Sequence, residues 1–335
     1  MAGVIVGATL SVSALSVSAL YLLKTVFKEK HFNENVDIVN KVVVITDGTS
    51  EIGKYLVREF YFRKARVYAF CPNKITFCNL KHYLSEYKCD LTRIKFVKCG
   101  LISFSAIKNF VKIFEKDEDV LDILINNADV KGHSYSESTI DHCEITWQTN
   151  YLGHFVLTEL LTPFLQKSKE GGRIINVSSG LESSCKELKL ETVNSSIDYD
   201  KDEAYSRSKL AQIMHAIEYT KRIRSADPDT KITINSCETS VKEAKVFRYN
   251  MLVTSFTNIT ISFLKWYFSE SPRDRAQCPL FLALSKKVAS ISGKHFVNSS
   301  EMHEINIIAS DANKCSELYD HSMKYMEEID NLCSF

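Results

Sequence analysis

From residue 41 onward, short runs rich in β-branched residues alternate with segments whose apolar residues recur at helical spacing. Strands that alternate with helices predict a parallel sheet, because each connecting helix returns the chain to the starting edge of the sheet. Helices then cover both faces, and ligands bind at the carboxyl ends of the strands, where the strand order reverses. We therefore expect a doubly wound α/β sheet of about seven strands, with its site at that edge.

The positions of these runs place the individual elements. Buried strands are predicted at Lys41–Thr46, Ala65–Phe70, Ile94–Cys99, Leu121–Ala128, Arg173–Ser179, Ile232–Cys237 and Lys294–Asn298. Helices are predicted near 52–64, 104–116, 144–168, 203–225 and 275–286. Neither an internal repeat nor a linker interrupts the pattern, so residues 31–335 are expected to form a single domain after an amino-terminal segment at 1–30.

The amino-terminal segment contains an uncharged run of 22 residues, Ala2 to Leu23, which is long enough to cross a membrane as a helix. Lys24, Lys28 and Lys30 follow the run, and no basic residue precedes it. By the positive-inside rule, this arrangement predicts a single-pass anchor with the main domain in the cytoplasm. A cleaved signal peptide is the alternative, because Val-Ser-Ala at 17–19 resembles a cleavage site, although a basic n-region is missing.

The composition, with 45% hydrophobic and 25% charged residues, excludes a disordered or collagen-like chain. Lysine and arginine total 42 against 41 acidic residues, and this balance gives no general attraction to nucleic acid. The ten cysteines include no Cys-x-x-Cys pair and the nine histidines show no ligand spacing, so we expect reduced, mostly buried cysteines and no metal site. Glycine is scarce, at 11 of 335 residues, so a site built from glycines has few to use.

Tyr205 and Lys209 stand four residues apart in a predicted helix, which places both side chains on one face. A phenol has an ordinary pKa of about 10, and a neighbouring ammonium lowers that pKa by favouring the phenolate. Such a pair can move a proton to or from an alcohol or carbonyl oxygen. The spacing alone is also common on solvated helix faces, so its significance depends on the residues around it.

Polar residues near the ends of two predicted strands supply this context. Ser178 and Ser179 end one strand, and a hydroxyl at that position can hold a reacting oxygen in place. The sequence Asn126-Asn127-Ala128 ends the preceding strand, and Asn150 opens a long apolar helix pattern. These residues fall where a doubly wound sheet is expected to bind its ligands.

This ordered set resembles the short-chain dehydrogenase/reductase superfamily over roughly residues 41–310. Among its branches, the chain looks most like the membrane-anchored retinol dehydrogenases. The motifs that carry this likeness are Asn-Tyr-Leu-Gly-His-Phe at 150–155, Arg-Ile-Ile-Asn-Val-Ser-Ser at 173–179, Tyr-Ser-Arg-Ser-Lys-Leu-Ala at 205–211 and Ser-Pro-Arg-Asp-Arg-Ala-Gln at 271–277. The resemblance implies a Rossmann-like fold and hydride transfer between a nicotinamide cofactor and a substrate carbon.

The resemblance also implies a catalytic tetrad of Asn150, Ser179, Tyr205 and Lys209. Tyr205 would exchange the substrate proton, and Ser179 would hydrogen-bond the substrate oxygen. Lys209 would lower the pKa of the tyrosine and bind the nicotinamide ribose, while Asn150 would place a water that relays protons. Contacts to the cofactor are implied for Thr46, Gly48, Ser50, Ile52, Gly53, Asn127, Ala128, Tyr205 and Lys209.

The cofactor loop departs from the family's Thr-Gly-x-x-x-Gly-x-Gly pattern. The chain reads Thr-Asp-Gly-Thr-Ser-Glu-Ile-Gly at 46–53, so Asp47 and Glu51 occupy the first two glycine positions. A carboxylate about 5 Å from a phosphate charge costs roughly 3 kcal/mol unless it turns away or finds a partner. Lys54 and Lys64 are available as partners.

Other implied cofactor contacts are altered as well. Pro72 stands where a relative would carry an arginine for the 2′-phosphate, with Lys74 as a substitute, and no acid favours NAD there, so NADP is expected in preference. Gly100 replaces an aspartate that would contact adenine, and Asp129 replaces a glycine. The Cys-Glu-Thr triplet at 237–239 replaces His-Pro-Gly beside the nicotinamide.

The segment 247–275 is rich in apolar and aromatic residues, which favours a lid over a lipophilic substrate, with plain core packing as the alternative.

The expected function is the NADP(H)-dependent interconversion of a lipophilic alcohol and its carbonyl, retinoid-like or steroid-like. The anchor is expected in the membrane of the endoplasmic reticulum, with a mitochondrial membrane as the second choice. A homodimer is the assembly considered. The alternative function is an inactive, membrane-tethered scaffold of the same fold that binds a lipid or a protein.

Overall fold

The computed structural model of the chain describes residues 31–239 and 271–332. The predicted anchor at 1–30 and most of the predicted lid at 247–275 lie outside these residues. In the described parts, no helix combines the length and the apolar character that a membrane crossing requires.

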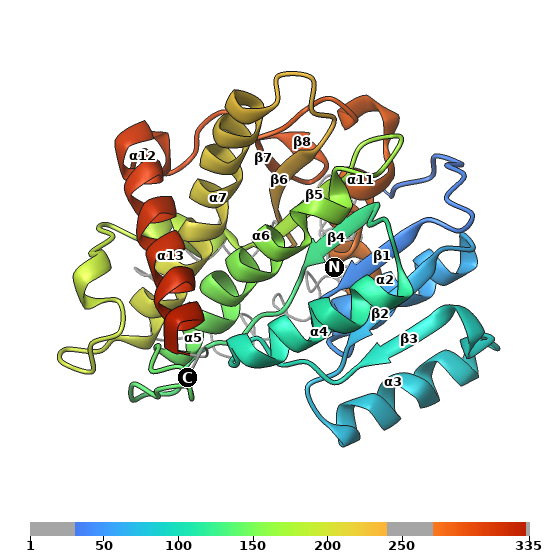
Figure 1. Ribbon diagram of the computed structural model, residues 1–335, viewed down its shortest axis with the longest axis horizontal. Coiled ribbons are helices and arrows are strands. Elements are labelled where there is room, and N and C mark those ends of the chain that lie inside the picture. Colours follow the sequence, from blue (N-terminus) through green and yellow to red (C-terminus); the bar gives the residue numbers. More distant parts are fainter. Residues whose placement is uncertain (1–30, 240–270, 333–335) are drawn as a thin grey trace, which may run out of the picture.

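An eight-stranded sheet forms the centre of the molecule, with the strand order β3-β2-β1-β4-β5-β6-β7-β8 (Figure 1). All neighbouring pairs are parallel except β7 with β8, which is antiparallel. The strands are β1 (Val42–Ile45), β2 (Arg66–Phe70), β3 (Ile94–Val97), β4 (Ile123–Asn126), β5 (Arg173–Ser178), β6 (Thr233–Glu238), β7 (His295–Val297) and β8 (Ser300–Glu301). Every predicted strand is confirmed, and the additional β8 is too short to show a sequence period.

Helices cover the sheet, and each predicted helical stretch has a counterpart among them. The helices are α2 (Glu51–Phe62), α3 (Lys74–Glu86), α4 (Phe104–Asp117), α5 (Ile145–Trp147), α6 (Gly153–Leu165), α7 (Lys201–Ala226), α10 (Pro272–Arg275), α11 (Gln277–Leu284), α12 (Ile307–Ser310) and α13 (Ala312–Leu332). The helical stretch predicted near 144–168 is confirmed, and within it a π-helical turn, Gln148–Leu152, separates α5 from α6. The stretch predicted near 275–286 is confirmed as α11, whereas α3, α10, α12 and α13 were not predicted.

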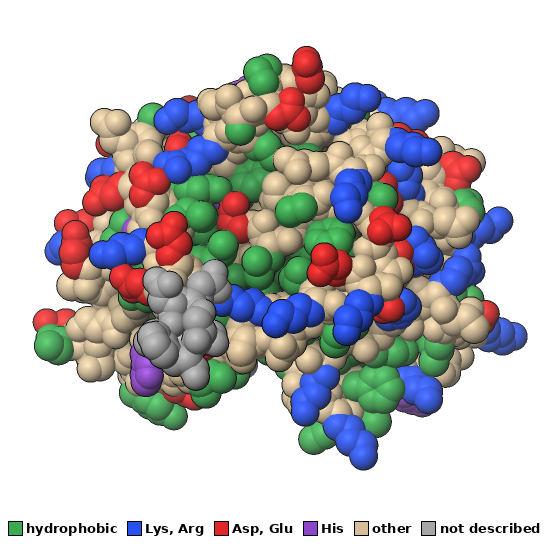
Figure 2. Space-filling model, in the orientation of Figure 1, with side chains coloured by type: hydrophobic (Ala, Val, Ile, Leu, Met, Phe, Trp, Pro, Cys, Tyr) green, Lys and Arg blue, Asp and Glu red, His purple; other side chains and the backbone are tan. Residues whose placement is uncertain are grey.

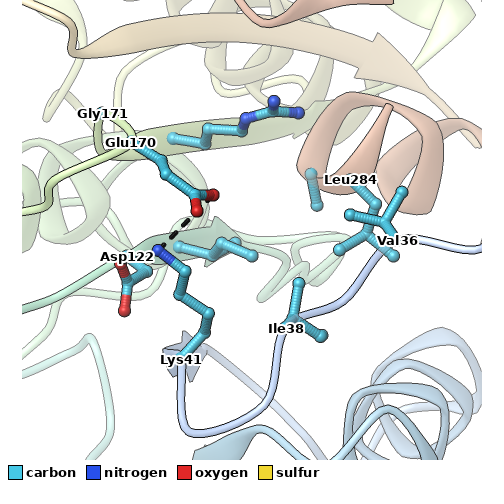
Figure 3. A pocket seen from close by; sticks show the side chains of 10 residues that line it. Val36, Ile38, Lys41, Asp122, Glu170, Gly171 and Leu284 are labelled. Atoms are coloured by element: carbon cyan, nitrogen blue, oxygen red, sulfur yellow. Dashed lines mark hydrogen bonds and ion pairs between the residues drawn. The ribbon is translucent and has the colours of Figure 1, made fainter. Parts of the chain in front are cut away.

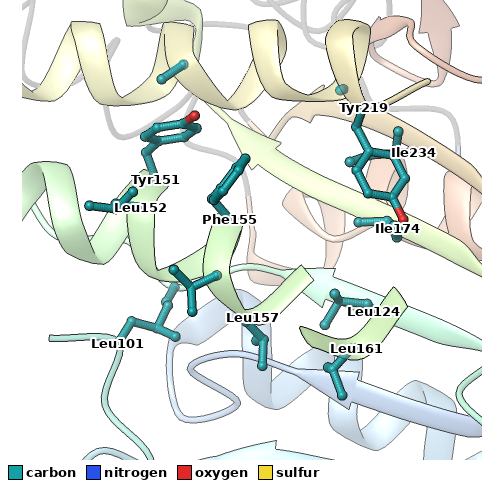
Figure 4. Packing of buried hydrophobic residues seen from close by; sticks show 14 of the residues in the cluster. Leu101, Leu124, Tyr151, Leu152, Phe155, Leu157, Leu161, Ile174, Tyr219 and Ile234 are labelled. Carbon is teal, nitrogen blue, oxygen red and sulfur yellow. The ribbon is translucent and has the colours of Figure 1, made fainter. Parts of the chain in front are cut away.

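Alternate residues of β1 face opposite helix layers, as a strand with both faces buried requires. Val42 and Val44 belong to the cluster that includes side chains of α4, α6, α7 and α13, whereas Val43 and Ile45 belong to the cluster with α2, α3 and α11. Figure 4 shows Phe155 of α6 in the first of these clusters. Both faces of the sheet are therefore covered, as the sequence predicted.

The long carboxyl-terminal helix α13 packs against α7, and its Leu318 and Tyr319 join the core cluster. The hydroxyl of Tyr319 donates a 2.7 Å hydrogen bond to Glu159 of α6. The guanidinium of Arg222 on α7 lies 4.3 Å from the centre of the Tyr319 ring. Burial raises the pKa of Glu159 to about 7, although Tyr319 and Arg222 favour its charged form.

The raised pKa of Glu159 gives an expected pH dependence of stability. A carboxyl with a folded pKa of about 7 against an ordinary 4.5 favours folding most at low pH, and stability falls as pH rises through that interval. Urea unfolding at about pH 5 and pH 8 should show a loss of about 2–3 kcal/mol in the wild type that Glu159→Gln lacks. Glu115→Gln, at an exposed site, should behave like the wild type, and an unchanged pH dependence in Glu159→Gln would contradict the assignment.

Candidate active site

The carboxyl ends of β1, β4 and β5 carry the polar residues singled out from the sequence. Thr46 follows β1, Asn127 follows β4 and Ser179 follows β5, while α7 carries Tyr205 and Lys209. Strands β1 and β4 are neighbours at the point where the strand order reverses. A doubly wound sheet opens its ligand crevice at this point.

A buried hydrogen-bond network joins the ends of β1 and β4. The hydroxyl of Thr46 accepts hydrogen bonds from the backbone N–H groups of Asn127 (2.8 Å) and Ala128 (2.9 Å), and it also bonds with His154 Nε2 (2.8 Å). The side-chain amide of Asn127 donates to the carbonyls of Thr46 (3.0 Å) and Asp47 (3.1 Å). Burial lowers the pKa of His154 to about 3, so the ring is neutral. These residues hold the two loops in a fixed relation.

Each of the two acids in the cofactor loop has a partner a few residues away in the chain. Asp47 has φ of 46°, the left-handed conformation that glycine would adopt there, and its carboxylate accepts a 2.6 Å hydrogen bond from the Thr49 hydroxyl. The carboxylate of Glu51 is 62% exposed and lies 2.6 Å from Lys54 Nζ. Lys64, the other expected partner, follows the opposite end of α2. The charge of Glu51 is thus directed to solvent and matched by a lysine.

The start of α2 keeps the features that bind an anion. The Ser50 hydroxyl caps the helix by accepting a 3.0 Å hydrogen bond from the Gly53 N–H. The N–H groups of Glu51 and Ile52 have no hydrogen-bond partner in the described residues. A Cβ on Gly53 would overlap the Asp47 carbonyl oxygen and lie 2.9 Å from Gly48 Cα, so the tight turn depends on this glycine.

Asp129 contacts both Tyr205 and Lys209 of α7. The hydroxyl of Tyr205 donates a hydrogen bond to Asp129 Oδ2 (3.0 Å), and Lys209 Nζ lies 3.0 Å from Asp129 Oδ1. Lys209 Nζ also donates to the Val177 carbonyl (3.1 Å) and has no exposed side-chain surface. The sequence therefore placed Tyr205 and Lys209 together correctly, but it did not reveal the carboxylate between them.

The surroundings of Tyr205 disfavour its phenolate. Burial is the largest cause of its raised pKa, and the charge of Asp129 adds to it, while the hydrogen bond with Ser179 and the charge of Arg275 lower it. The ammonium of Lys131 lies 5.4 Å from the centre of the Tyr205 ring. With Asp129 in this position, Tyr205 is held as a neutral phenol.

Asn150 lies in the π-helical turn between α5 and α6 and is fully buried. Its side chain accepts from the N–H of Val130 (2.8 Å) and donates to the carbonyl of Val130 (2.9 Å) and the hydroxyl of Ser208 (3.0 Å). Its own carbonyl accepts a hydrogen bond from Gln212 Nε2. Asn150 thus fixes the loop that carries Asp129 against α7.

Comparison with known proteins adds to this geometry. The family model described as short chain dehydrogenase matches residues 41–249. Retinol dehydrogenase 14 of Mus musculus is 31% identical over 291 residues, which cover 84% of this chain and 84% of the relative. The chain belongs to the short-chain dehydrogenase family. Retinol dehydrogenase 12 of Homo sapiens, 33% identical over 78% of this chain and 79% of the relative, further supports the retinol dehydrogenase branch.

Solved structures agree with the fold of this short-chain dehydrogenase. An uncharacterized protein from Mycobacterium paratuberculosis aligns with a TM-score of 0.68 at 22% identity, covering 89% of this chain and 98% of the other. The Pseudomonas aeruginosa RhlG/NADP active-site complex aligns with a TM-score of 0.56 at 18% identity, covering 79% and 97%. The resemblance stated from the sequence is confirmed at the level of fold and family, and the chain is a member of an oxidoreductase family.

The residues of this dehydrogenase fit a dinucleotide at the phosphate end, because the unpaired N–H groups and the glycine turn at the start of α2 remain. After β2, Pro72 and Lys74 are both exposed, and Asn73 caps α3 by accepting from the Thr76 N–H. At the other end of the crevice, the side chain of Asp129 already pairs with Lys209. The start of α2 therefore fits the phosphates of a dinucleotide, whereas near Tyr205 and Lys209 the carboxylate of Asp129 competes with a ligand for Lys209.

A separate pocket lies at the opposite end of the strands. Lys41, Asp122 and Arg173, at or next to the amino ends of β1, β4 and β5, line it together with Glu170 (Figure 3). Lys41 Nζ lies 3.1 Å from Asp122 and 3.6 Å from Glu170, and Arg173 donates to two backbone carbonyls. Since these polar groups satisfy one another, we interpret this pocket as a structural feature of the sheet edge.

The cysteine prediction is confirmed for the described residues. The nine cysteines described are free, and all except Cys78 are buried. Burial raises the pKa of Cys71, Cys99 and Cys143 to about 12, so these thiols are protonated at neutral pH.

Proposed function

We propose that this chain interconverts a lipophilic alcohol and its carbonyl with NADP(H), and that Tyr205 is the proton donor and acceptor. The observation that carries the proposal is the placement of Tyr205 and Lys209 on α7 beside Ser179 at the end of β5. The family supports the reaction class, since the chain is about 30% identical to retinol dehydrogenases.

Each residue of the tetrad has a task that its position supports. A bound nicotinamide supplies or accepts the hydride. Tyr205 transfers the proton to or from the substrate oxygen, and Ser179, which hydrogen-bonds Tyr205, holds that oxygen. Lys209 orients the site from its fixed position beside the Val177 carbonyl. Asn150 holds the loop after β4 in place through its hydrogen bonds with Val130. The family resemblance implies that it also places a water that relays protons.

We propose NADP rather than NAD. No carboxylate stands directly after β2, and Lys74 begins α3 next to that strand end. A free acid at this position would repel a 2′-phosphate, whereas a lysine would attract it. Two structural neighbours support this choice: the RhlG complex with NADP and an actinorhodin polyketide ketoreductase with NADPH. The remaining cofactor contacts are proposed for Thr46, Gly48, Ser50, Ile52, Gly53, Asn127 and Ala128.

The substrate and location are proposed from the sequence and the relatives' names. The relatives are named retinol dehydrogenases, and the segment 247–275 is rich in apolar residues; both favour a retinoid-like or other lipophilic carbonyl as the substrate. The apolar run at 2–23 favours a membrane anchor with the domain in the cytoplasm, at the endoplasmic reticulum first and a mitochondrial membrane second. Figure 2 shows acidic and basic side chains both spread over the face drawn. The near balance of charge gives no reason to propose a nucleic-acid partner.

A second candidate function is an inactive scaffold of the same fold. The observation that favours it is the pairing of Asp129 with both Tyr205 and Lys209, which engages the proton-transfer pair internally. Such a protein would bind a lipid or a protein partner without turnover.

Titration of the purified full chain with NADPH and NADH, followed by fluorescence, separates the two candidates. We expect micromolar binding of NADPH that is tighter than the binding of NADH, followed by NADPH oxidation with retinal or another aldehyde of a panel. A chain that binds neither cofactor at millimolar concentration would exclude the enzyme and leave the scaffold. Tighter binding of NADH would contradict the proposed preference alone.

A further inference from the structure

Asp129 uses both oxygens of its carboxylate on the two residues that the proposed reaction needs. One oxygen accepts the only proton of the Tyr205 hydroxyl at 3.0 Å, and the other lies 3.0 Å from Lys209 Nζ. Lys209 is fully buried and also donates a hydrogen bond to the Val177 carbonyl. The carboxylate of Asp129 thus binds both the hydroxyl proton of Tyr205 and the ammonium group of Lys209.

This arrangement competes with catalysis for simple chemical reasons. A substrate oxygen must accept a hydrogen bond from Tyr205 before it can take the proton, and that hydrogen is already donated to Asp129. The charge of Asp129 also opposes loss of the phenolic proton, since it is the second cause, after burial, of the raised pKa of Tyr205. A ligand hydroxyl that approaches Lys209 must replace the carboxylate as well.

Of the three side chains, Asp129 is the most exposed and the one with room to rotate. Its side chain is 39% exposed, whereas the Tyr205 residue is 5% exposed and the Lys209 side chain is not exposed at all. Tyr205 and Lys209 are fixed by their places in α7, and Lys209 also by Val177. Asp129 lies in the loop after β4, so rotation of its side chain toward solvent would release both contacts. The buried residues therefore form the fixed part of the site and Asp129 the movable part.

The other groups facing Tyr205 would support proton transfer once Asp129 has turned away. Lys131 of the same loop lies 5.4 Å from the centre of the Tyr205 ring, and the charge of Arg275 on α10 lowers the pKa of Tyr205. The Ser179 hydroxyl, from the end of β5, also lowers it. With Asp129 turned away, the groups left around Tyr205 are cations and a hydroxyl, which support proton transfer.

We propose that Asp129 is an internal gate of the active site, which holds Tyr205 and Lys209 in a closed state and must turn away before cofactor and substrate are bound productively. This inference rests on the proposed function, because it assumes that the crevice binds a dinucleotide. The apparent affinity of a ligand falls by the fraction of molecules in the open state, so an open fraction of about 1–10% weakens binding about 10- to 100-fold.

The test compares NADPH binding by the purified full chain and by three variants. Asp129→Gly removes the carboxylate, and Asp129→Asn keeps the shape of the side chain without its charge. Asp119→Asn removes one charge at an exposed position before β4, at the opposite end of that strand, and serves as the matched control. Fluorescence titration should show that both Asp129 variants bind NADPH about tenfold more tightly or better, while the control stays within about twofold of the wild type.

A second measurement separates a gate from a structural effect. In the direction of alcohol oxidation, turnover of Asp129→Asn should reach its half-maximum at lower pH than turnover of the wild type, because the charge that raises the pKa of Tyr205 is gone. Thermal unfolding of each variant establishes that the compared proteins are folded.

The possible results distinguish the gate from the proposed function. Tighter NADPH binding by folded Asp129 variants that turn over no substrate supports the gate and contradicts the oxidoreductase. Turnover by the wild type, with equal or weaker NADPH binding by both folded variants, overturns the gate alone. Failure of all four proteins to bind NADPH overturns both.

Discussion

Tyr205→Phe is expected to reduce turnover by roughly 10²- to 10⁴-fold, because it removes the hydroxyl that we propose exchanges the substrate proton. The ring keeps its place on α7 beside Lys209, whose Nζ lies 5.6 Å from the ring centre. NADPH affinity should therefore remain at the wild-type level or improve, since the variant also loses the hydrogen bond to Asp129. Single-turnover kinetics with a carbonyl substrate, together with fluorescence titration of NADPH, measure the two effects separately.

Tyr219→Phe is the matched control for this prediction. Tyr219 lies on the same helix, is also buried, and directs its hydroxyl to Thr162 at 2.7 Å, away from the site residues. Its loss should cost some stability and leave the turnover number within about threefold of the wild type. Turnover in Tyr205→Phe equal to that of the control would show that another group transfers the proton.

Gly53→Ala is expected to damage both the fold and cofactor binding. An added Cβ would overlap the Asp47 carbonyl and lie 2.9 Å from Gly48 Cα and from the Ser50 hydroxyl. These atoms belong to the backbone of the turn and to its helix cap, so they can yield only if the cofactor loop shifts. Urea unfolding should show a loss of about 1–3 kcal/mol, and NADPH should bind more weakly because the first-turn N–H groups move.

Gly100→Ala provides the control for this substitution. The nearest atom to an added Cβ at Gly100 is a side-chain carbon of Ile102 at 3.7 Å, which is an ordinary contact. Its free energy of unfolding and its NADPH affinity should stay close to those of the wild type. Equal stability of Gly53→Ala and Gly100→Ala would show that the loop is looser than the close packing around Gly53 implies.

The sheet could be predicted from the sequence because buried parallel strands appear as β-branched runs bounded by turns. The change from α- to π-helical bonding at Gln148–Leu152 could not, because no proline or glycine within those residues marks it. Helix α3 gave little signal, since only Leu80 and Leu84 of its residues are buried. Elements that bury one or two side chains leave too weak a period to be recognised.

The site was predicted in part. The pairing of Tyr205 with Lys209 follows from helical spacing, and the pairing of Glu51 with Lys54 is a local contact that the sequence made available. Asp129 was noted only as a lost glycine. Its contact with Tyr205 joins two elements far apart in the chain, and no spacing rule predicts which side chain of a loop turns toward a helix from another part of the sheet.

The packing of α13 on α7 has a consequence for the order in which the protein matures. Helix α7, which carries Tyr205 and Lys209, is synthesised well before α13, whose Leu318 and Tyr319 complete the core cluster around it. Domains generally fold as units, and apolar surface that is exposed in the meantime is prone to wrong contacts. Helix α7 can therefore complete its packing only after the ribosome has released α13, and until then its apolar face is available for such contacts.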